Sequence, residues 1–271
     1  MNIKIIYNSE KPFGFKIAEQ VSAILSIENV TISLLEFDKT KEPRIDNNDF
    51  VVVIGGDGTI LKVAKAAALN NCPILGINAG RVGYLASVDS NDLLPIKRLV
   101  TGDYSVERRT MIKASKYVNG SLIESCDCLN DAVISKDLLS NIIDINLTIG
   151  NDTIKYRADG IIASTPTGST AYSLSAGGPV VDPALQCMVI TPVCPHTLVA
   201  RSVVLDINTE VSVSIDCKDS NKFYLLCDGR KAFELDSDTT VKFTKSEISA
   251  SFIKLNDVSV YKVFNNKTVN Y

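Results

Sequence analysis

Apolar residues in the first part of the chain alternate between strand-like runs and helix-like spacing. Continuous runs rich in β-branched residues, at 3–7, 30–35 and 50–54, predict strands buried on both faces of a parallel sheet. Between and after these runs, apolar residues recur every three or four positions, which predicts helices with one buried face: Ile17, Val21, Ile24, Leu25, Ile60, Ala64, Ala67 and Ala68. We therefore expect an N-terminal α/β domain with a doubly wound, Rossmann-like sheet.

The period of the apolar pattern changes near residue 104. Residues 143–149 alternate strictly between apolar and polar side chains, and residues 211–215 repeat the pattern. Such alternation predicts strands with one solvent-facing side. Asn-Gly at 119–120 is a strong hairpin signal. We expect the second half to be mostly β, with a domain boundary near residues 102–109.

A glycine-rich turn, Gly-Gly-Asp-Gly-Thr at residues 55–59, joins the 50–54 run to the helical spacing that follows it. Ligands of open α/β sheets bind at such turns, because helix N-terminal N–H groups favour anions. A carboxylate beside a phosphate is repelled unless it binds a metal or receives a proton, so Asp57 is a candidate chemical group. The alternative is an aspartate that caps the helix, and spacing alone favours neither interpretation. The motif is neither the dinucleotide fingerprint nor a Walker A loop.

Two stretches of the second half have unusual polar residues. Asn130 and Asp131 lie side by side at the start of a predicted strand, where an ordinary turn would also explain them. Residues 161–181 carry no charge but contain many hydroxyls and glycines. Two prolines and three glycines exclude a membrane helix there, and we interpret the stretch as a binding loop. Such a loop suits the edges of adenine and ribose, and Tyr172 could stack on a ring.

Composition narrows the class of protein further. The chain has 271 residues, with 28 basic and 31 acidic side chains and a net charge of -3, which argues against broad binding to nucleic acid. No secretion signal is visible, and seven cysteines in no regular framework fit a reducing cytoplasm. Cys126 and Cys128 are interpreted as small core or edge residues, because with a single histidine a zinc site is not expected. That histidine, His196, has no acid or nucleophile partner in the sequence and is left out of the chemistry.

Together, these stretches closely resemble the NAD kinase family. The turn at residues 55–59 matches the first signature of that family, and Asn130-Asp131 matches its Asn-Glu/Asp pair. The long second signature corresponds to residues 159–175 and 177–179, and a further segment to residues 195–198. Lipid kinases share the first signature, and 6-phosphofructokinases have a related turn. The block at residues 170–175 distinguishes the NAD kinases. The chain departs from the family in the shorter carboxylate of Asp131 and in Arg230, where many members carry glutamine.

The resemblance implies a reaction and a set of site residues. It implies transfer of the terminal phosphoryl group of ATP or polyphosphate to the 2′-hydroxyl of the adenosine ribose of NAD, giving NADP, with a divalent cation, Mg²⁺ above all. Asp57 would accept the proton, with Gly58 beside it. Lys62 and Arg157 would stand at the charged edges of the pocket. The remaining implied contacts to NAD are Asn130, Asp131, Asp159, Thr167, Thr170, Ala171, Tyr172, Ser173, Leu174 and Ser175.

The resemblance also implies an architecture. It predicts an α/β N-terminal domain at residues 1–103 and an all-β sandwich at residues 104–250, with NAD bound between them. Residues 251–271 are expected to return to the N-terminal domain. The expected state is a cytoplasmic homodimer or homotetramer that binds NAD and ATP, without nucleic acid or membrane partners.

The role of Asp57 follows from acidity. An aspartic acid is far more acidic than a ribose hydroxyl, so Asp57 must orient that hydroxyl and accept its proton late in the reaction. Alignment, the metal and N–H groups should supply most of the acceleration. Two rival functions stay open at this point. A lipid or sphingoid-base kinase would need an apolar acceptor pocket, and a non-catalytic NAD(H) sensor would bind NAD without making NADP.

Overall fold

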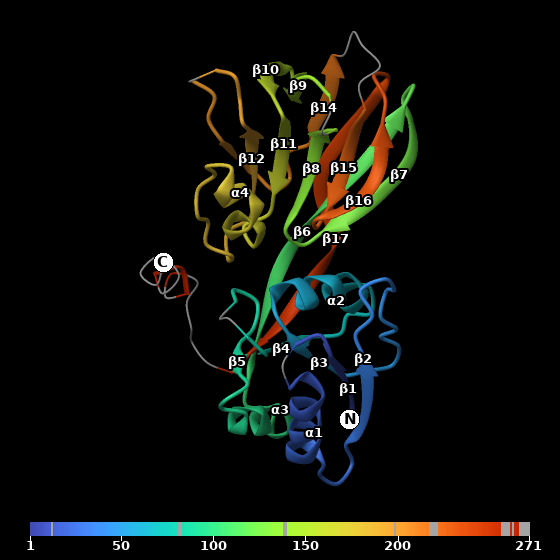
Figure 1. Ribbon diagram of the computed structural model, residues 1–271, viewed down its shortest axis with the longest axis vertical. Coiled ribbons are helices and arrows are strands. Elements are labelled where there is room, and N and C mark those ends of the chain that lie inside the picture. The colour runs from blue at the N-terminus through green and yellow to red at the C-terminus, as the bar shows by residue number, and fades with distance from the viewer. Residues whose placement is uncertain are drawn as a thin grey trace. The chain divides into compact units, whose positions relative to one another are not determined.

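A computed structural model describes the whole chain except residues 12, 81–82, 138–139, 198, 217–221, 256–260, 262 and 266–271. The chain divides into two compact units, Met1–Arg109 with Ser249–Tyr271, and Thr110–Ile248. Two long strands, β6 (Ser105–Val118) and β17 (Thr239–Lys254), have residues in both units. Figure 1 labels the elements of each unit. Of the segment expected to return to the first domain, only residues 251–255, 261 and 263–265 are described.

The first unit is a parallel sheet covered by helices. Its elements are β1 (Asn2–Tyr7), α1 (Gly14–Leu25), β2 (Thr31–Glu36), β3 (Phe50–Gly55), α2 (Asp57–Leu69), β4 (Ile74–Asn78), β5 (Val88–Asp89), the 3₁₀ turn η1 (Leu94–Lys97) and α3 (Arg98–Thr101). The strands lie in the order β2-β1-β3-β4, and both β5 and the end of β17 pair with β4 in parallel.

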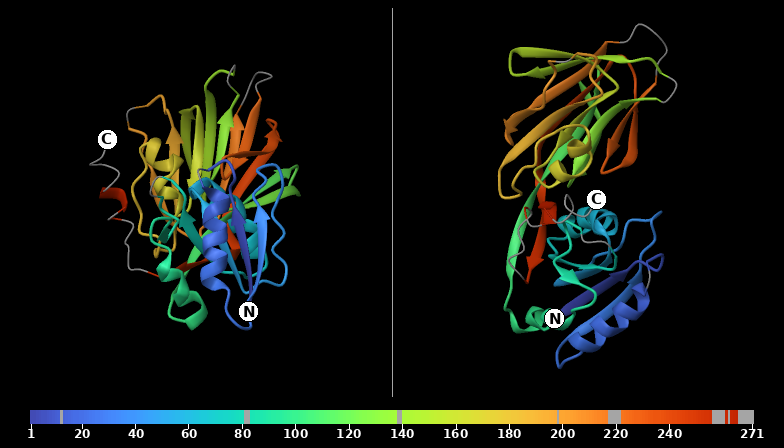
Figure 2. Two further views of the ribbon diagram at one scale, coloured as in Figure 1. Left: turned by 60° about the horizontal axis from the view of Figure 1, so that its bottom comes forward. Right: turned by 60° about the vertical axis from the view of Figure 1, so that its left-hand side comes forward.

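Helices α1 and α2 cover opposite faces of this sheet (Figure 2). On one face, Ile17 and Val21 of α1 join a core cluster with Ile5 and Val52. On the other face, Ile60 of α2 packs against Gly76. All six residues of β3 are buried, as expected for a strand with helices on both sides. The predicted doubly wound α/β fold is confirmed.

The second unit contains two packed sheets. One has the strand order β13-β12-β11-β8-β15-β16. The other joins β10, β9, β14 and β17, and the β6–β7 hairpin extends it through β17. The strands not yet located are β7 (Ser121–Cys128), β8 (Asp131–Lys136), β9 (Ile143–Ile149), β10 (Asp152–Ala158), β11 (Gly160–Ser164), β12 (Cys187–Val193), β13 (Val203–Asp206), β14 (Val211–Asp216), β15 (Phe223–Cys227) and β16 (Arg230–Leu235).

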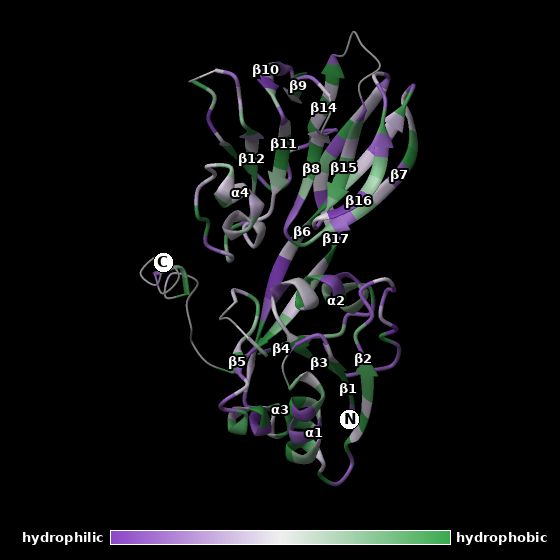
Figure 3. Ribbon diagram, in the orientation of Figure 1, coloured by the Kyte–Doolittle hydropathy of each residue, from purple (hydrophilic) through white to green (hydrophobic). Residues whose placement is uncertain are grey.

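One hydrophobic core fills the space between these two sheets. It includes Ile134 and Ile161 from one sheet and Leu147, Val213 and Phe243 from the other. Leu147, Val213 and Phe243 are apolar members of alternating strands, and Figure 3 shows the hydrophobic positions concentrated along the strands. The predicted β-sandwich is confirmed. Asn119 and Gly120 both adopt positive φ, 51° and 77°, as a two-residue hairpin turn between β6 and β7 requires.

Two predictions need correction. Residues 161–181 were expected to form a binding loop, but the stretch begins inside β11 and continues through the 3₁₀ turn η2 (Gly168–Thr170) and the short helix α4 (Tyr172–Ser175). Ile161, Ile162 and Ala163 are buried, so β11 lacks the polar alternation that marks a half-exposed strand. Cys126 is not a simple core or edge residue, because it forms a disulfide with Cys227.

Candidate active site

Asp57 is the first residue of α2, and only Gly56 separates it from the end of β3. The residue before it, Gly56, is the N-cap in an extended conformation, and no side chain caps the helix. The Asp57 carboxylate instead accepts hydrogen bonds from the backbone N–H groups of Tyr84, at 2.8 Å, and Leu85, at 3.1 Å. The helix-capping interpretation of Asp57 is therefore wrong. The side chain holds the loop that follows β4.

The surroundings of Asp57 leave its carboxylate able to accept a further hydrogen bond. The two amides occupy one acceptor site on each carboxylate oxygen, and a carboxylate oxygen has two. Gly83 packs so closely that an added Cβ would lie 2.0 Å from an Asp57 oxygen. Gly58, in contrast, is exposed, and an added Cβ there would meet no described atom within 4 Å. A ligand can therefore approach the backbone beside Asp57.

Two asparagines outside the predicted site residues lie at strand ends near this turn. Asn8 follows β1, is buried, and donates a 3.0 Å hydrogen bond to the Thr59 hydroxyl. Asn78 ends β4 beside Gly55, and its buried side-chain oxygen has no hydrogen-bond partner among the described residues. Since β1 and β3 flank the point where strand order reverses, Asn8 at the end of β1 lies where α/β proteins bind ligands, and Asn78 lies at the end of the next strand, β4. The signal that could have identified both residues from the sequence is an asparagine at the end of a buried apolar strand.

In the second unit, the Asn-Asp pair and the second signature come together. Asp131 pairs with Ser164 across β8 and β11. The Asn130 carbonyl accepts a 2.9 Å hydrogen bond from the Thr165 N–H, and the Thr165 hydroxyl donates to the Leu129 carbonyl at 2.5 Å. Gly168 packs on the same strand start, because an added Cβ would lie 2.0 Å from the Asn130 carbonyl oxygen. The backbone of residues 129–131 is thus fixed by the turn after β11.

The hydroxyl-rich block forms η2 and α4. Thr167 is buried, and the Thr170 hydroxyl donates to its carbonyl at 3.4 Å. Ser173 is also buried, with its hydroxyl 3.0 Å from that of Thr191. Tyr172 is 47% exposed, which leaves its ring available to a ligand. Ser175 is exposed, and Ala171 and Leu174 are half-buried.

Electrostatics distinguish Asp131 among these groups. Burial, together with the nearby negative charge of Asp228, raises the pKa of Asp131 to about 7. Burial also raises the pKa of Tyr172, with smaller contributions from Cys194, Asp131 and Asp159. A carboxylic acid whose charge changes near neutral pH is typical of functional sites.

Three charged side chains, those of Asp159, Arg157 and Lys62, were also predicted for the site. Asp159 precedes β11, at the opposite end of that strand from Ser164, and pairs with Lys136 at 3.6 Å. Arg157 on β10 is exposed and lies 3.8 Å from Asp144. Lys62 is half-buried on α2, with its amine 5.8 Å from the centre of the Phe37 ring. Within the second unit, neither Asp159 nor Arg157 has a described hydrogen bond to Asn130 or Thr165.

The described surface also has a cavity of about 580 Å³ in the first unit. It is lined by β2 and by the segment that follows it, including Lys4, Phe37 and Arg44. None of the predicted site residues lines it, so the cavity does not mark the chemistry inferred from the sequence. None of the helices in the described part of the chain is long and apolar enough to cross a membrane.

Comparison with known proteins agrees with this arrangement. The model of the ATP-NAD kinase N-terminal domain matches residues 12–104, and that of the ATP-NAD kinase C-terminal domain matches residues 129–255. The NAD kinase of Symbiobacterium thermophilum is 32% identical over 275 residues, covering 97% of each chain. The NAD kinase of Geotalea daltonii is 38% identical over 221 residues, covering 81% of this chain and 78% of the relative.

Solved structures show the same fold. The structure of an NAD kinase from Archaeoglobus fulgidus in complex with ATP has a TM-score of 0.76 at 28% identity and covers 99% of this chain and 98% of that one. Yeast NADH kinase, complexed with NADH, has a TM-score of 0.86 at 20% identity, covering 100% and 88%. The two domain matches and the extent of identity show that the chain belongs to the NAD kinase family, enzymes that transfer a phosphoryl group from ATP to the 2′-hydroxyl of the adenosine ribose of NAD.

Proposed function

We propose that Asp57 is the proton acceptor of this reaction. The observation that carries the proposal is the fixed carboxylate at the junction of β3 and α2, which is held by two amide N–H groups and caps nothing in its own helix. As the ribose oxygen bonds to the terminal phosphorus of ATP and the bond to the bridging oxygen breaks, the hydroxyl proton passes to Asp57 and ADP leaves. Gly58 is exposed at the N-terminus of α2, where backbone N–H groups suit phosphoryl oxygens.

We propose that the second unit holds NAD. Asn130 and Asp131 would bind the adenosine half, supported by the turn at Thr165 and Gly168 that fixes their backbone. Tyr172 would offer its exposed ring as a stacking surface. Lys62 and Arg157 would supply charge for phosphates. The other proposed contacts are Asp159, Thr167, Thr170, Ala171, Ser173, Leu174 and Ser175.

We also propose a magnesium ion, bound together with ATP. The chain offers oxygen ligands that fit this ion, the Asp57 carboxylate and the buried, unpartnered side-chain oxygen of Asn78. Magnesium is usually held by one or two protein carboxylates plus substrate phosphates, and it would neutralise charge on those phosphates. We further propose that polyphosphate can replace ATP, with its magnesium ion bound by the same two ligands.

The assembly and location are proposals of the same kind. Leu122 and Ile123 on β7 are 56% and 53% exposed, and among the described residues β7 pairs only with β6. An exposed apolar edge strand favours association, so we propose a homodimer or homotetramer. We propose a cytoplasmic location, which fits the free thiols of Cys72, Cys128, Cys187 and Cys194, although the Cys126–Cys227 disulfide is unusual in a reducing compartment. The domain boundaries 1–103, 104–250 and 251–271 remain our proposal.

The test of the base is Asp57→Asn. We expect NAD binding to persist while turnover falls by about 10²-fold or more, because the variant cannot take the hydroxyl proton. A coupled assay of NADP formation measures turnover, and calorimetry measures NAD binding. Asp46→Asn, the same change at an exposed loop residue of the first unit, is the matched control and should leave both unchanged. Turnover within about threefold of the unmodified protein would remove Asp57 from the proton transfer.

A further inference from the structure

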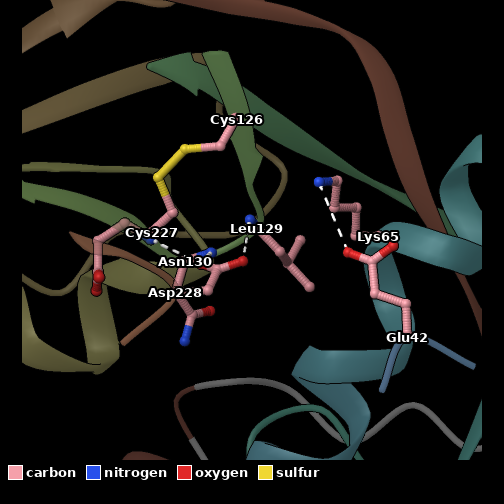
Figure 4. Close-up of a disulfide and its surroundings, with 8 residues drawn as sticks. Glu42, Lys65, Cys126, Leu129, Asn130, Cys227 and Asp228 are labelled. Carbon is pink, nitrogen blue, oxygen red and sulfur yellow. Dashed lines mark hydrogen bonds and ion pairs between the residues drawn. A yellow bond between two sulfur atoms is a disulfide. The ribbon is translucent and has the colours of Figure 1, made fainter. Parts of the chain in front are cut away.

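Asp228 lies in the turn between β15 and β16 and hydrogen-bonds a different part of the chain. Asp228 and Gly229 both have positive φ, 48° and 74°, as an Asp-Gly hairpin turn requires. The Asp228 carboxylate accepts hydrogen bonds from the backbone N–H groups of Leu129 at 2.9 Å and Asn130 at 2.8 Å (Figure 4). It also accepts one from the N–H of Asp131 at 3.2 Å. Its own N–H donates to the Asp131 carbonyl at 2.9 Å.

These bonds orient the start of β8. Three successive N–H groups converge on one carboxylate, a charge-assisted arrangement that is stronger than bonds between neutral groups. On its other side, the same backbone is fixed by Thr165, whose N–H donates to the Asn130 carbonyl. Without the Asp228 carboxylate, three N–H groups would lose their acceptor, and the segment would have to rotate toward other partners.

The Cys126–Cys227 disulfide joins the same two segments. Cys227 directly precedes Asp228, and Cys126 lies three residues before Leu129 (Figure 4). The covalent link keeps the turn beside the strand start whatever residue occupies position 228. A substitution at Asp228 therefore changes the orientation of the three amides more than their proximity to the turn.

We propose that Asp228 is a positioning residue for NAD binding, which sets the orientation of Asn130 and Asp131 through their backbone N–H groups. The inference rests on the proposed role of Asn130 and Asp131 as contacts to the adenosine half of NAD. It assigns a function to Asp228, the aspartate of the Asp-Gly turn that directly precedes Arg230.

The test is Asp228→Asn. Asparagine keeps the size of the side chain and tolerates positive φ, but it places an NH₂ group or a single neutral oxygen before the three N–H donors. We expect the KM for NAD to rise by about 10-fold or more, from the loss of charge-assisted bonds, while kcat and the KM for ATP change by less than about threefold. Steady-state assays of NADP formation at varied NAD and varied ATP measure all three.

Asp228→Ala extends the test, and Asn119→Ala is its matched control. Both substitutions place alanine at positive φ in a two-residue hairpin turn, with the same backbone cost, but only Asp228 holds the 129–131 segment. We expect a larger rise in the KM for NAD for Asp228→Ala and none for Asn119→Ala. A folded Asp228→Asn protein with an unchanged KM for NAD would overturn the proposal. So would a fall in kcat together with an equal rise in both KM values, if these changes track a lower melting temperature.

Asn130→Ala separates this inference from the function on which it rests. If Asn130→Ala leaves the KM for NAD unchanged, the proposed role of Asn130 in nucleotide binding fails, and the positioning role fails with it. If Asn130→Ala raises the KM for NAD but Asp228→Asn does not, the nucleotide site stands and only the positioning role is overturned.

Discussion

Asp131 shows at the residue scale how the fold changes the chemistry of a side chain. It is 5% exposed, and the charged groups that face it are Asp228 from the β15–β16 turn, with Cys128 from β7 and Tyr172 from α4 as neighbouring acids. Burial, then Asp228, raises its pKa to about 7. Asp131 is therefore neutral in the folded protein at a pH where it is charged in the unfolded chain.

This shift predicts a pH dependence of stability. Between about pH 4 and pH 7 the folded state binds a proton at Asp131 that the unfolded state has lost, so the free energy of unfolding should fall as pH rises through this window, by up to about 1.4 kcal/mol per unit. Urea unfolding from pH 4.5 to 8 measures the slope. Asp131→Asn should flatten this slope. The part of the slope that remains would come from Asp228, whose pKa is also raised by burial.

The exposed Asp152 on β10 supplies the control, because Asp152→Asn should leave the slope as it is. An Asp131→Asn protein with the same slope as the unmodified one would show that Asp131 keeps its ordinary acidity in the folded state.

At the scale of elements, the disulfide joins β7 to β15 across a sequence separation of 101 residues. Closing so long a loop restricts the unfolded chain, and disulfides of this kind typically contribute about 2–4 kcal/mol. We expect reduction to lower the free energy of unfolding by that amount, measured by urea unfolding with and without a reductant.

The double variant Cys126→Ser/Cys227→Ser should show the lower stability and no response to the reductant. Peptide mapping of the unreduced protein should recover the linked pair. Equal stability with and without reductant, in a protein that maps with the link intact, would contradict the expected contribution.

The elements also show which parts of the fold the sequence could predict. The buried 50–54 run and the helical spacing from Ile60 predicted β3 and α2, because tertiary packing agrees there with local period. The strand β11 was missed, because its residues are buried on both sides and are followed by a hydroxyl-rich turn, so neither strand nor helix period appears.

The residues of the candidate site also divide into those that local motifs could predict and those that they could not. Asp57, Asn130 and the 170–175 block were predicted as site residues from local motifs. Asp228 and the Cys126–Cys227 pair were not, because each acts on a segment about a hundred residues away, as the separation of 101 residues shows for the disulfide. Contacts of that kind depend on strand pairing between β8 and β15, which no local pattern reports.

At the scale of the whole molecule, the exposed apolar edge of β7 predicts association. Light scattering on the purified protein should give a mass of two or four chains, because association would bury the exposed side chains of Leu122 and Ile123. Leu122→Lys/Ile123→Lys should reduce that mass while leaving the melting temperature of each chain nearly unchanged. A single-chain mass for the unmodified protein would contradict the proposed assembly.

In the proposed reaction, the α/β unit would supply the carboxylate and the β-sandwich would supply the nucleotide contacts, so the reaction would require both. The measurement that tests this account most directly is a single-turnover experiment, with enzyme in excess over NAD and with ATP and magnesium added. It reports phosphoryl transfer separately from product release. We predict that Asp57→Asn protein saturated with NAD forms NADP about 10²-fold or more slowly than the unmodified protein. Equal single-turnover rates for the two proteins would contradict the assignment of Asp57.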